Sequence, residues 1–371
     1  MILLYFSTIF ILALVQYYVV VLSNDIELKI LFERLFFRAL YMVIFIWLFY
    51  IALIKEIGTS NNDTGNYIRA FQLMSDSIYD YKSSQDRLLI NGLSFEPLYL
   101  LLMQFWISFI NNNWLVAVSA FTILSIVLTF TFFNKNTKLY YLAILLYSSH
   151  FLWVKDFNQL RNAMASAIVW FLPALWHEKR WKFFLILAVA ISIQSASVFI
   201  LVALFFSKYL SKYFLDHRGF LFLLIISIIL YYTNVSSFIF VNVFANISSQ
   251  ASAYLYRSSD IADRGVFANP VVIKGIIFSL IFIANRDNLI KRNSSNGYYI
   301  NIYIFGILWT IIFSGIGIFA NRFASYVTGF ECLLMAEILC FRKNIWLFGV
   351  VLVVAVAQFY IDYILMLVPQ V

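Results

Sequence analysis

At residues 159–167 the chain reads QLRNAMASA, which places Arg161 at the head of an otherwise apolar segment. Lys155 and Asp156 stand just upstream, and residues 168–176 carry no charge. A guanidinium at the mouth of a hydrocarbon segment costs several kcal/mol unless another group pairs with it. We therefore treat Arg161 as a candidate functional residue, with a side chain that only reaches for the membrane interface as the alternative.

The composition sets the class of protein. Of the 371 residues, 63% are hydrophobic and 12% are charged, whereas a soluble domain is about 25% charged. Apolar runs recur along the whole chain, and the first, residues 2–22, has no basic leader or small-residue cleavage site. These runs predict an all-α, polytopic membrane protein of about 10–12 transmembrane or re-entrant helices, organised as one integral membrane domain over residues 1–371.

Lysine and arginine gather mostly in short loops, as they do on the cytoplasmic side of membrane proteins. The formal charge of +8 therefore implies no nucleic-acid partner. The strongest basic cluster, HEKRWK at residues 177–182, is expected in the cytoplasm and places Arg161 at the exterior end of its helix. The two long loops of mixed charge, at about residues 55–96 and 242–269, are expected on the exterior face.

Three apolar runs separate the first exterior loop from Arg161, where an even number of crossings is required. We therefore expect one of the short runs, 98–110 or 139–153, to enter the membrane and return. The run at 183–206 poses the same problem, because basic clusters flank it on both sides. It is interrupted by Ser192, Gln194, Ser195 and Ser197.

We predict that residues 183–206 form a broken, re-entrant pair of half-helices with Gln194 near the tip. Non-helical backbone at that depth is tolerated only where protein or a wet cavity surrounds it; a plain span with polar packing residues is the alternative. Residues 298–320 are expected to span outward as one helix, so that residues 321–326 lie where it meets the exterior.

The expected exterior ends gather arginines and carboxylates. Arginine's planar fork suits bidentate phosphate binding, so arginines at the lip of an apolar cavity fit an anionic head with a lipid tail, such as a polyprenyl pyrophosphate. A nearby carboxylate can act as general base for a hydroxyl. The residues concerned are Arg161, Arg257, Arg264 and Arg322, with Asp63, Glu96, Asp156, Asp260 and Asp263.

Several chemistries lack their motifs. The chain has no Asp-x-Asp, Walker loop, Gly-x-Gly-x-x-Gly or Gly-x-Ser-x-Gly, so nucleotide-sugar, ATP-driven and dinucleotide chemistry are unsupported. Its three histidines are scattered, without metal-ligand spacing. Cys332 and Cys340 lie eight apart in one apolar run and are interpreted as packing residues. No metal or cofactor is expected.

The segment Gln159–Ala165, reading QLRNAMA, resembles the (I/L)R(Q/N)xxA helix start of the EpsG-type and Wzy-type bacterial polysaccharide polymerases. Over roughly residues 55–330 other short motifs follow in the order typical of that family. They are an exterior Asp63–Tyr67 with Phe71, then Phe95-Glu96-Pro97, a polar break after the Arg161 helix, and a late Arg322–Tyr326. Many relatives carry a histidine in the broken segment where this chain has Gln194, which puts an acid–base role there in doubt.

The resemblance implies an O-antigen or exopolysaccharide polymerase in the bacterial inner (cytoplasmic) membrane. Such an enzyme transfers a glycan from undecaprenyl pyrophosphate to another lipid-linked repeat unit at the periplasmic face, sometimes with a chain-length regulator. It would resemble the polyprenyl-donor membrane glycosyltransferases. The catalytic residues would be Asp63, Glu96, Arg161 and Arg322, and the substrate-binding residues Asp156, Gln159, Gln194, Arg257, Arg264 and Tyr326.

Other classes remain open at this stage. A flippase for lipid-linked oligosaccharide would share the arginine-lined cavity. Such transporters usually show two similar halves, and the two halves of this sequence show no convincing match. A ligase that joins polymer to lipid A core is chemically close to a polymerase. A membrane acyltransferase would need a catalytic histidine, for which His150 is a poor candidate, and a non-enzymatic scaffold would not need buried charges.

Overall fold

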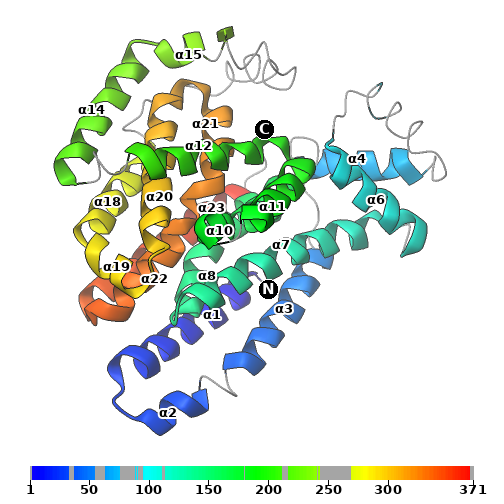
Figure 1. Ribbon diagram of the computed structural model, residues 1–371. Helices are drawn as coiled ribbons and strands as arrows, with labels where there is room; N and C mark the ends of the chain where they lie inside the picture. The colour runs from blue at the N-terminus through cyan, green and yellow to red at the C-terminus, as the bar shows by residue number, and fades with distance from the viewer. Residues whose placement is uncertain are drawn as a thin grey trace. The chain divides into compact units, whose positions relative to one another are not determined.

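The computed structural model describes residues 2–32, 37–54, 63–75, 88, 90, 95–110, 113–178, 180–210, 216–239, 241–242 and 269–367. Within these ranges every regular element is a helix (Figure 1). By length and composition, four of them can cross a membrane: Ile2–Leu22, Trp114–Asn136, Phe319–Arg342 and Ile345–Asp362. Shorter apolar helices accompany them. The predicted all-α membrane class is confirmed, and the number of crossings stays a prediction.

The chain forms two compact units, which are described separately, and the expectation of a single domain stays a prediction. The first unit comprises Met1–Leu172, Lys179–Ser195 and Met335–Val371. Its helices are α1 (Ile2–Tyr17), α2 (Ile26–Leu31), α3 (Phe37–Ile54), α4 (Asp63–Ser75), α6 (Pro97–Phe109), α7 (Trp114–Asn136), α8 (Tyr140–Ser148), α9 (Leu160–Val169), α11 (Arg180–Ile193) and α23 (Ile345–Leu367), with π-helical turns η1 (Tyr18–Leu22) and η3 (Leu152–Asp156).

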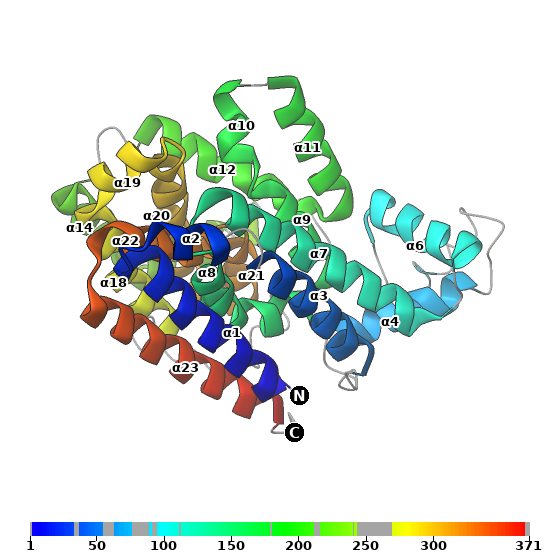
Figure 2. The ribbon, with the colours of Figure 1, turned by 90° about the horizontal axis from the view of Figure 1, so that it is seen from below.

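Helix starts in this unit follow from local sequence. Pro97 occupies the first turn of α6, where its missing N–H costs no hydrogen bond, and Glu96 precedes it in an extended conformation. The Asn113 side chain accepts a hydrogen bond from the Leu115 N–H (2.9 Å) and so caps α7. The two ends of the chain pack together, since α1 and α23 run side by side (Figure 2) and the rings of Phe6 and Phe359 stack at 3.9 Å.

The second unit comprises Pro173–Glu178 and Ala196–Leu334. Asn269 caps one of its helices through the Val271 N–H (3.0 Å), and Pro270 follows at the first position. The helices are α10 (Leu172–Glu178), α12 (Phe199–Phe205), α14 (His217–Tyr232), α15 (Val235–Ile239), α18 (Pro270–Ala284), α19 (Arg286–Arg292), α20 (Asn296–Ile312) and α21 (Gly317–Thr328), with turns η5 (Phe206–Leu210) and η8 (Ser314–Ile316). Helix α22 (Phe330–Arg342) begins in this unit and continues into the first from Met335.

One predicted span is wrong. Residues 298–320 do not form a single helix, because α20 ends at Ile312 and η8 turns the chain before α21 begins at Gly317. Helix α21 then packs against α20 (Figure 1) at a glycine crossing, where a Cβ on Gly306 would lie 2.4 Å from Val327 Cγ2. Such close approach of two helices requires a residue without a side chain. The turn η8 that separates these two helices lies inside an apolar run of the sequence.

The predicted break in residues 183–206 is confirmed. Helix α11 ends at Ile193, Gln194 is not helical, and the 3-10 turn η4 (Ser195–Val198) precedes α12. Whether the two half-helices return to one side of the membrane stays a prediction.

Candidate functional site

Helix α9 brings Arg161 to its first turn after a short irregular link from η3. The end of this link is tied to the helix, because Asn162 Nδ2 of α9 donates to Gln159 Oε1 (2.8 Å). Ala163, Ala165 and Ala167 behind them are almost fully buried. Small residues let neighbouring helices approach closely, so this helix start is held firmly in place.

The Arg161 guanidinium forms an ion pair with Glu96 through Nη1 and Oε2. The two side chains are only 15% and 11% exposed, so both charges are largely removed from solvent. The other carboxylate oxygen of Glu96 accepts two hydrogen bonds from Ser195, one from the backbone N–H (2.9 Å) and one from the hydroxyl (3.0 Å). One carboxylate thus joins the starts of α6, α9 and η4.

Three aromatic rings surround the same guanidinium. Arg161 Cζ lies 4.4 Å from the ring centre of Phe95, 5.8 Å from that of Tyr67 and 5.9 Å from that of Tyr99. The rings also contact each other, with Phe95 and Tyr99 stacked at 5.8 Å. A cation over aromatic faces is stabilised electrostatically, more strongly where water is excluded. We call Arg161, Glu96, Ser195 and these three rings the Arg161 cluster.

This cluster gathers motifs that are far apart in the sequence. Tyr67 comes from α4, Glu96 and Phe95 from the link before α6, Arg161 from α9, and Ser195 from the predicted polar break. A cation, a carboxylate, a hydroxyl and a backbone N–H lie within one hydrogen-bonded group. Such a group can hold an anionic headgroup or a sugar hydroxyl, and it provides aromatic faces for a sugar ring.

Asp156 and Lys155 precede the cluster along the chain and are almost fully buried. The Asp156 carboxylate accepts hydrogen bonds from the hydroxyls of Ser125 (2.6 Å) and Tyr147 (2.5 Å), both within the first unit. Burial raises the pKa of the Asp156 carboxyl above its ordinary value, while those two hydrogen bonds act in the opposite direction. Its substrate-binding role stays a prediction.

The other predicted site residues lie apart from one another along the chain. Asp63 is the first residue of α4, and Gln194 is half-buried at the break after α11. Arg322 and Tyr326 lie one turn apart in α21, in the second unit, where Tyr326 is buried. Their predicted place beside Arg161 stays a prediction. Arg257 and Arg264, with Asp260 and Asp263, fall outside the described residues.

Two members of the cluster were not singled out from the sequence. Ser195 appeared only as one of several polar residues in the break, next to Gln194. Tyr99 lies three residues after Glu96 in an apolar helix and carries no signal of its own, although that spacing places it on the same face of the helix.

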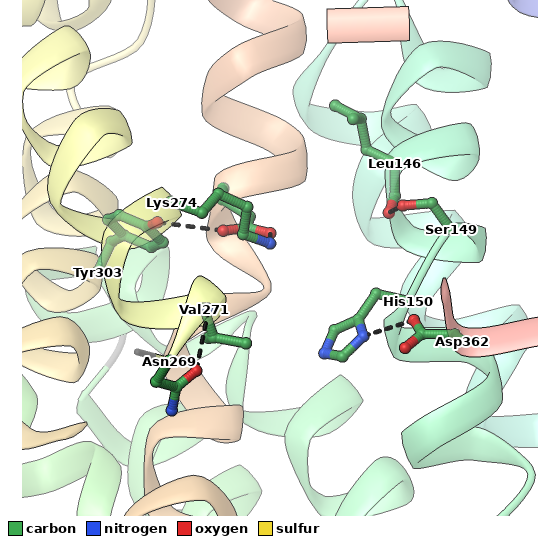
Figure 3. A network of polar contacts seen from close by, with 9 residues as sticks. Leu146, Ser149, His150, Asn269, Val271, Lys274, Tyr303 and Asp362 are labelled. Atoms are coloured by element: carbon green, nitrogen blue, oxygen red, sulfur yellow. Dashed lines mark hydrogen bonds and ion pairs between the residues drawn. The ribbon is translucent and has the colours of Figure 1, made fainter. Parts of the chain in front are cut away.

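Two further ion pairs lie among apolar helices (Figure 3). In the second unit, Lys274 Nζ of α18 lies 2.6 Å from Glu331 Oε1 of α22, and the Tyr303 hydroxyl donates to Glu331 Oε2 (3.1 Å). In the first unit, His150 Nδ1 lies 2.7 Å from Asp362 Oδ2 of α23. Within the described ranges no three His, Cys, Asp or Glu residues are placed to hold a metal ion.

The EpsG family model matches residues 37–369, which is nearly the whole chain, and the chain therefore belongs to the EpsG family. Membership implies a role in exopolysaccharide biosynthesis. No curated protein and no solved structure matches the chain.

Proposed function

We propose that this member of the EpsG family polymerises a surface polysaccharide, either an O-antigen or an exopolysaccharide. The reaction transfers a glycan from undecaprenyl pyrophosphate to another lipid-linked repeat unit. It takes place at the periplasmic face of the bacterial inner membrane. The donor and acceptor are both amphipathic, so the site needs a polar group at the edge of an apolar helical bundle.

The observation that carries this proposal is the Arg161 cluster. Glu96 and Ser195, which are 99 positions apart along the chain, bond to each other, and Glu96 also pairs with the Arg161 guanidinium. Buried charge is retained among apolar helices at a cost, and function is the usual reason. A guanidinium supported in this way suits the pyrophosphate of a lipid-linked donor.

In the proposed reaction, Arg161 and Arg322 hold the donor pyrophosphate and stabilise the negative charge that develops on it as it leaves. A carboxylate, Asp63 or Glu96, accepts the proton of the acceptor hydroxyl. The hydroxyl oxygen forms a bond to the anomeric carbon, and the bond from that carbon to the pyrophosphate oxygen breaks. The pyrophosphate departs with the bonding electrons, still attached to its lipid.

The other predicted residues serve binding. The sugars of the substrate are hydrogen-bonded by Gln159, Gln194 and Tyr326. Asp156 contributes to the same substrate-binding region. The second lipid-linked unit is guided by Arg257 and Arg264. The proposed reaction needs no metal or cofactor. A chain-length regulator is proposed as a further partner of the protein.

Deletion of the gene tests the proposal against its rivals. A strain without a polymerase keeps a glycolipid with a single repeat unit and lacks the ladder of longer polymers. Loss of a ligase would leave bare core, and loss of a flippase would leave lipid-linked units on the cytoplasmic side. Gel banding of surface polysaccharide, with lipid-linked units measured in the two leaflets, distinguishes these results; either of the last two contradicts the proposal.

A further inference from the structure

The two carboxylates named as candidate bases differ in how they are held. Glu96 accepts from three donors at once: Arg161 Nη1 on one oxygen, and the Ser195 N–H and hydroxyl on the other. Both of its oxygens are therefore engaged by groups of the protein itself. A general base must instead present an oxygen within hydrogen-bond reach of the substrate hydroxyl.

The same contacts give Glu96 another task. Its backbone is fixed by Pro97, which locks the start of α6, and its side chain reaches α9 and the break at Ser195. The carboxylate thereby sets the direction of the Arg161 guanidinium while Phe95 covers the face of that group at 4.4 Å. A guanidinium has five N–H donors in a rigid fork, so a partner on Nη1 orients the others.

We infer that Glu96 and Ser195 are positioning residues, which act on the donor through Arg161, and that Glu96 is not the base. This inference rests on the proposed function. The proton of the acceptor hydroxyl goes to Asp63. Asp63 is four residues before Tyr67 in α4, so the two positions share a helix face, and Tyr67 is one of the rings around Arg161.

The test is a kinetic comparison of purified full-length protein in nanodiscs. Its substrate is the lipid-linked repeat unit extracted from the deletion strain of the same organism. Glu96→Gln keeps an oxygen that can accept from Ser195 but removes the negative charge that pairs with Arg161. We expect its KM for the lipid-linked unit to rise about ten- to a hundredfold, because a charge-assisted hydrogen bond is lost. The pH profile of kcat should keep its shape.

The companion variants carry opposite expectations. Asp63→Asn should lower kcat by about 10²–10⁴-fold, as expected for loss of a general base, with KM little changed. Ser195→Ala should raise KM, as Glu96→Gln does. The increase in KM of the double variant should be smaller than the product of the two single increases, since both residues act on one guanidinium. Ser192→Ala, a half-buried serine three positions earlier, is the matched control and should behave as wild type.

The inference is overturned if Glu96→Gln lowers kcat by a hundredfold or more and removes the acid limb of the pH profile, or if it changes nothing. Where Glu96→Gln fails to fold, Ser195→Ala decides: its side chain is exposed, so a loss of kcat with unchanged KM contradicts the positioning role. Failure of the proposed function is a separate result, since wild-type protein would then not extend the lipid-linked unit at all.

Discussion

Two ion pairs among apolar helices, Arg161–Glu96 and Lys274–Glu331, are built on different kinds of backbone. The first joins the starts of helices and a break, with aromatic rings around the cation. The second joins α18 to α22, and its carboxylate lies within the candidate span Phe319–Arg342. Glu331 also accepts from Tyr303 of α20, so three helices share one carboxylate.

The difference indicates what each pair is for. A pair within regular helices can satisfy its charges and hold the helices together, and nothing else about its backbone is unusual. The Arg161 pair lies where the backbone is irregular, because Glu96 is extended before α6, Arg161 is in the first turn of α9 and Ser195 follows the break at Gln194. Irregular backbone among apolar helices is tolerated where protein buries it or where it lines a wet cavity, and here it carries a charged pair and a hydroxyl. We therefore assign the Arg161 pair to function, whereas the Lys274 pair satisfies its charges among packed helices and takes no part in the proposed reaction.

The largest effect is expected from Lys274→Met. The substitution keeps the volume of the side chain but leaves the Glu331 carboxylate buried without its cation, at a cost of about 3–5 kcal/mol. Unfolding in detergent and the amount of protein in the membrane should both show this loss. Polymer made per folded molecule should stay near the wild-type value, and a selective loss of polymer at normal stability would break the assignment.

Arg161→Ala should have the reverse pattern. Polymer yield at matched protein level should fall about 10²–10³-fold, the effect of removing one electrostatic stabiliser of a transition state. Arg218→Ala, which removes an exposed arginine of α14, is the control and should leave yield unchanged. Polymer ladders from complemented deletion cells measure both variants. A full ladder of polymers from Arg161→Ala would contradict the functional role of Arg161.

Phe95→Leu should have a smaller effect on the same cluster. It removes the ring closest to the guanidinium, and a cation–π contact is worth about 0.5–2 kcal/mol. We expect a graded loss of polymer yield, between that of wild type and that of Arg161→Ala. Phe109→Leu, at the exposed end of α6, is the matched control. Equal yields from the two variants would show that the ring does not support Arg161.

The smallest effect is expected from the double variant Lys274→Met with Glu331→Gln. Both charges disappear together, and replacement of a buried ion pair by uncharged residues is often neutral or stabilising. Unfolding in detergent should return close to the wild-type value, which contrasts with Lys274→Met alone. A double variant as unstable as the single one would mean that the pair is not what makes Lys274 important.

Much of this architecture could be predicted from apolar runs and breakers. The bounds of α18 and α23 coincide with largely apolar stretches of the sequence, residues 270–284 and 345–367, and the break at Gln194 was expected from its polar neighbours. The turn before Gly317 was not, because it lies inside an apolar run, and hydropathy does not reveal where a chain reverses between packed helices.

The sequence indicated several residues of the candidate site, but it did not indicate which of them contact each other. Short motifs indicated Arg161, Glu96 and Tyr67, since charge and proline stand out in an apolar chain. The pairing of Glu96 with Ser195 depends on how distant helix starts meet, which no local pattern encodes. The roles of Arg257 and Arg264 likewise depend on tertiary structure and stay predictions.

Chain extension with purified protein tests whether the Arg161 cluster is the donor site of a polymerase. Wild-type protein and Arg161→Ala are reconstituted side by side with the lipid-linked repeat unit, and the products are separated by length. We expect a ladder of polymers from wild type and only the starting unit from Arg161→Ala, with both proteins folded. A ladder of equal length and yield from folded Arg161→Ala would contradict it.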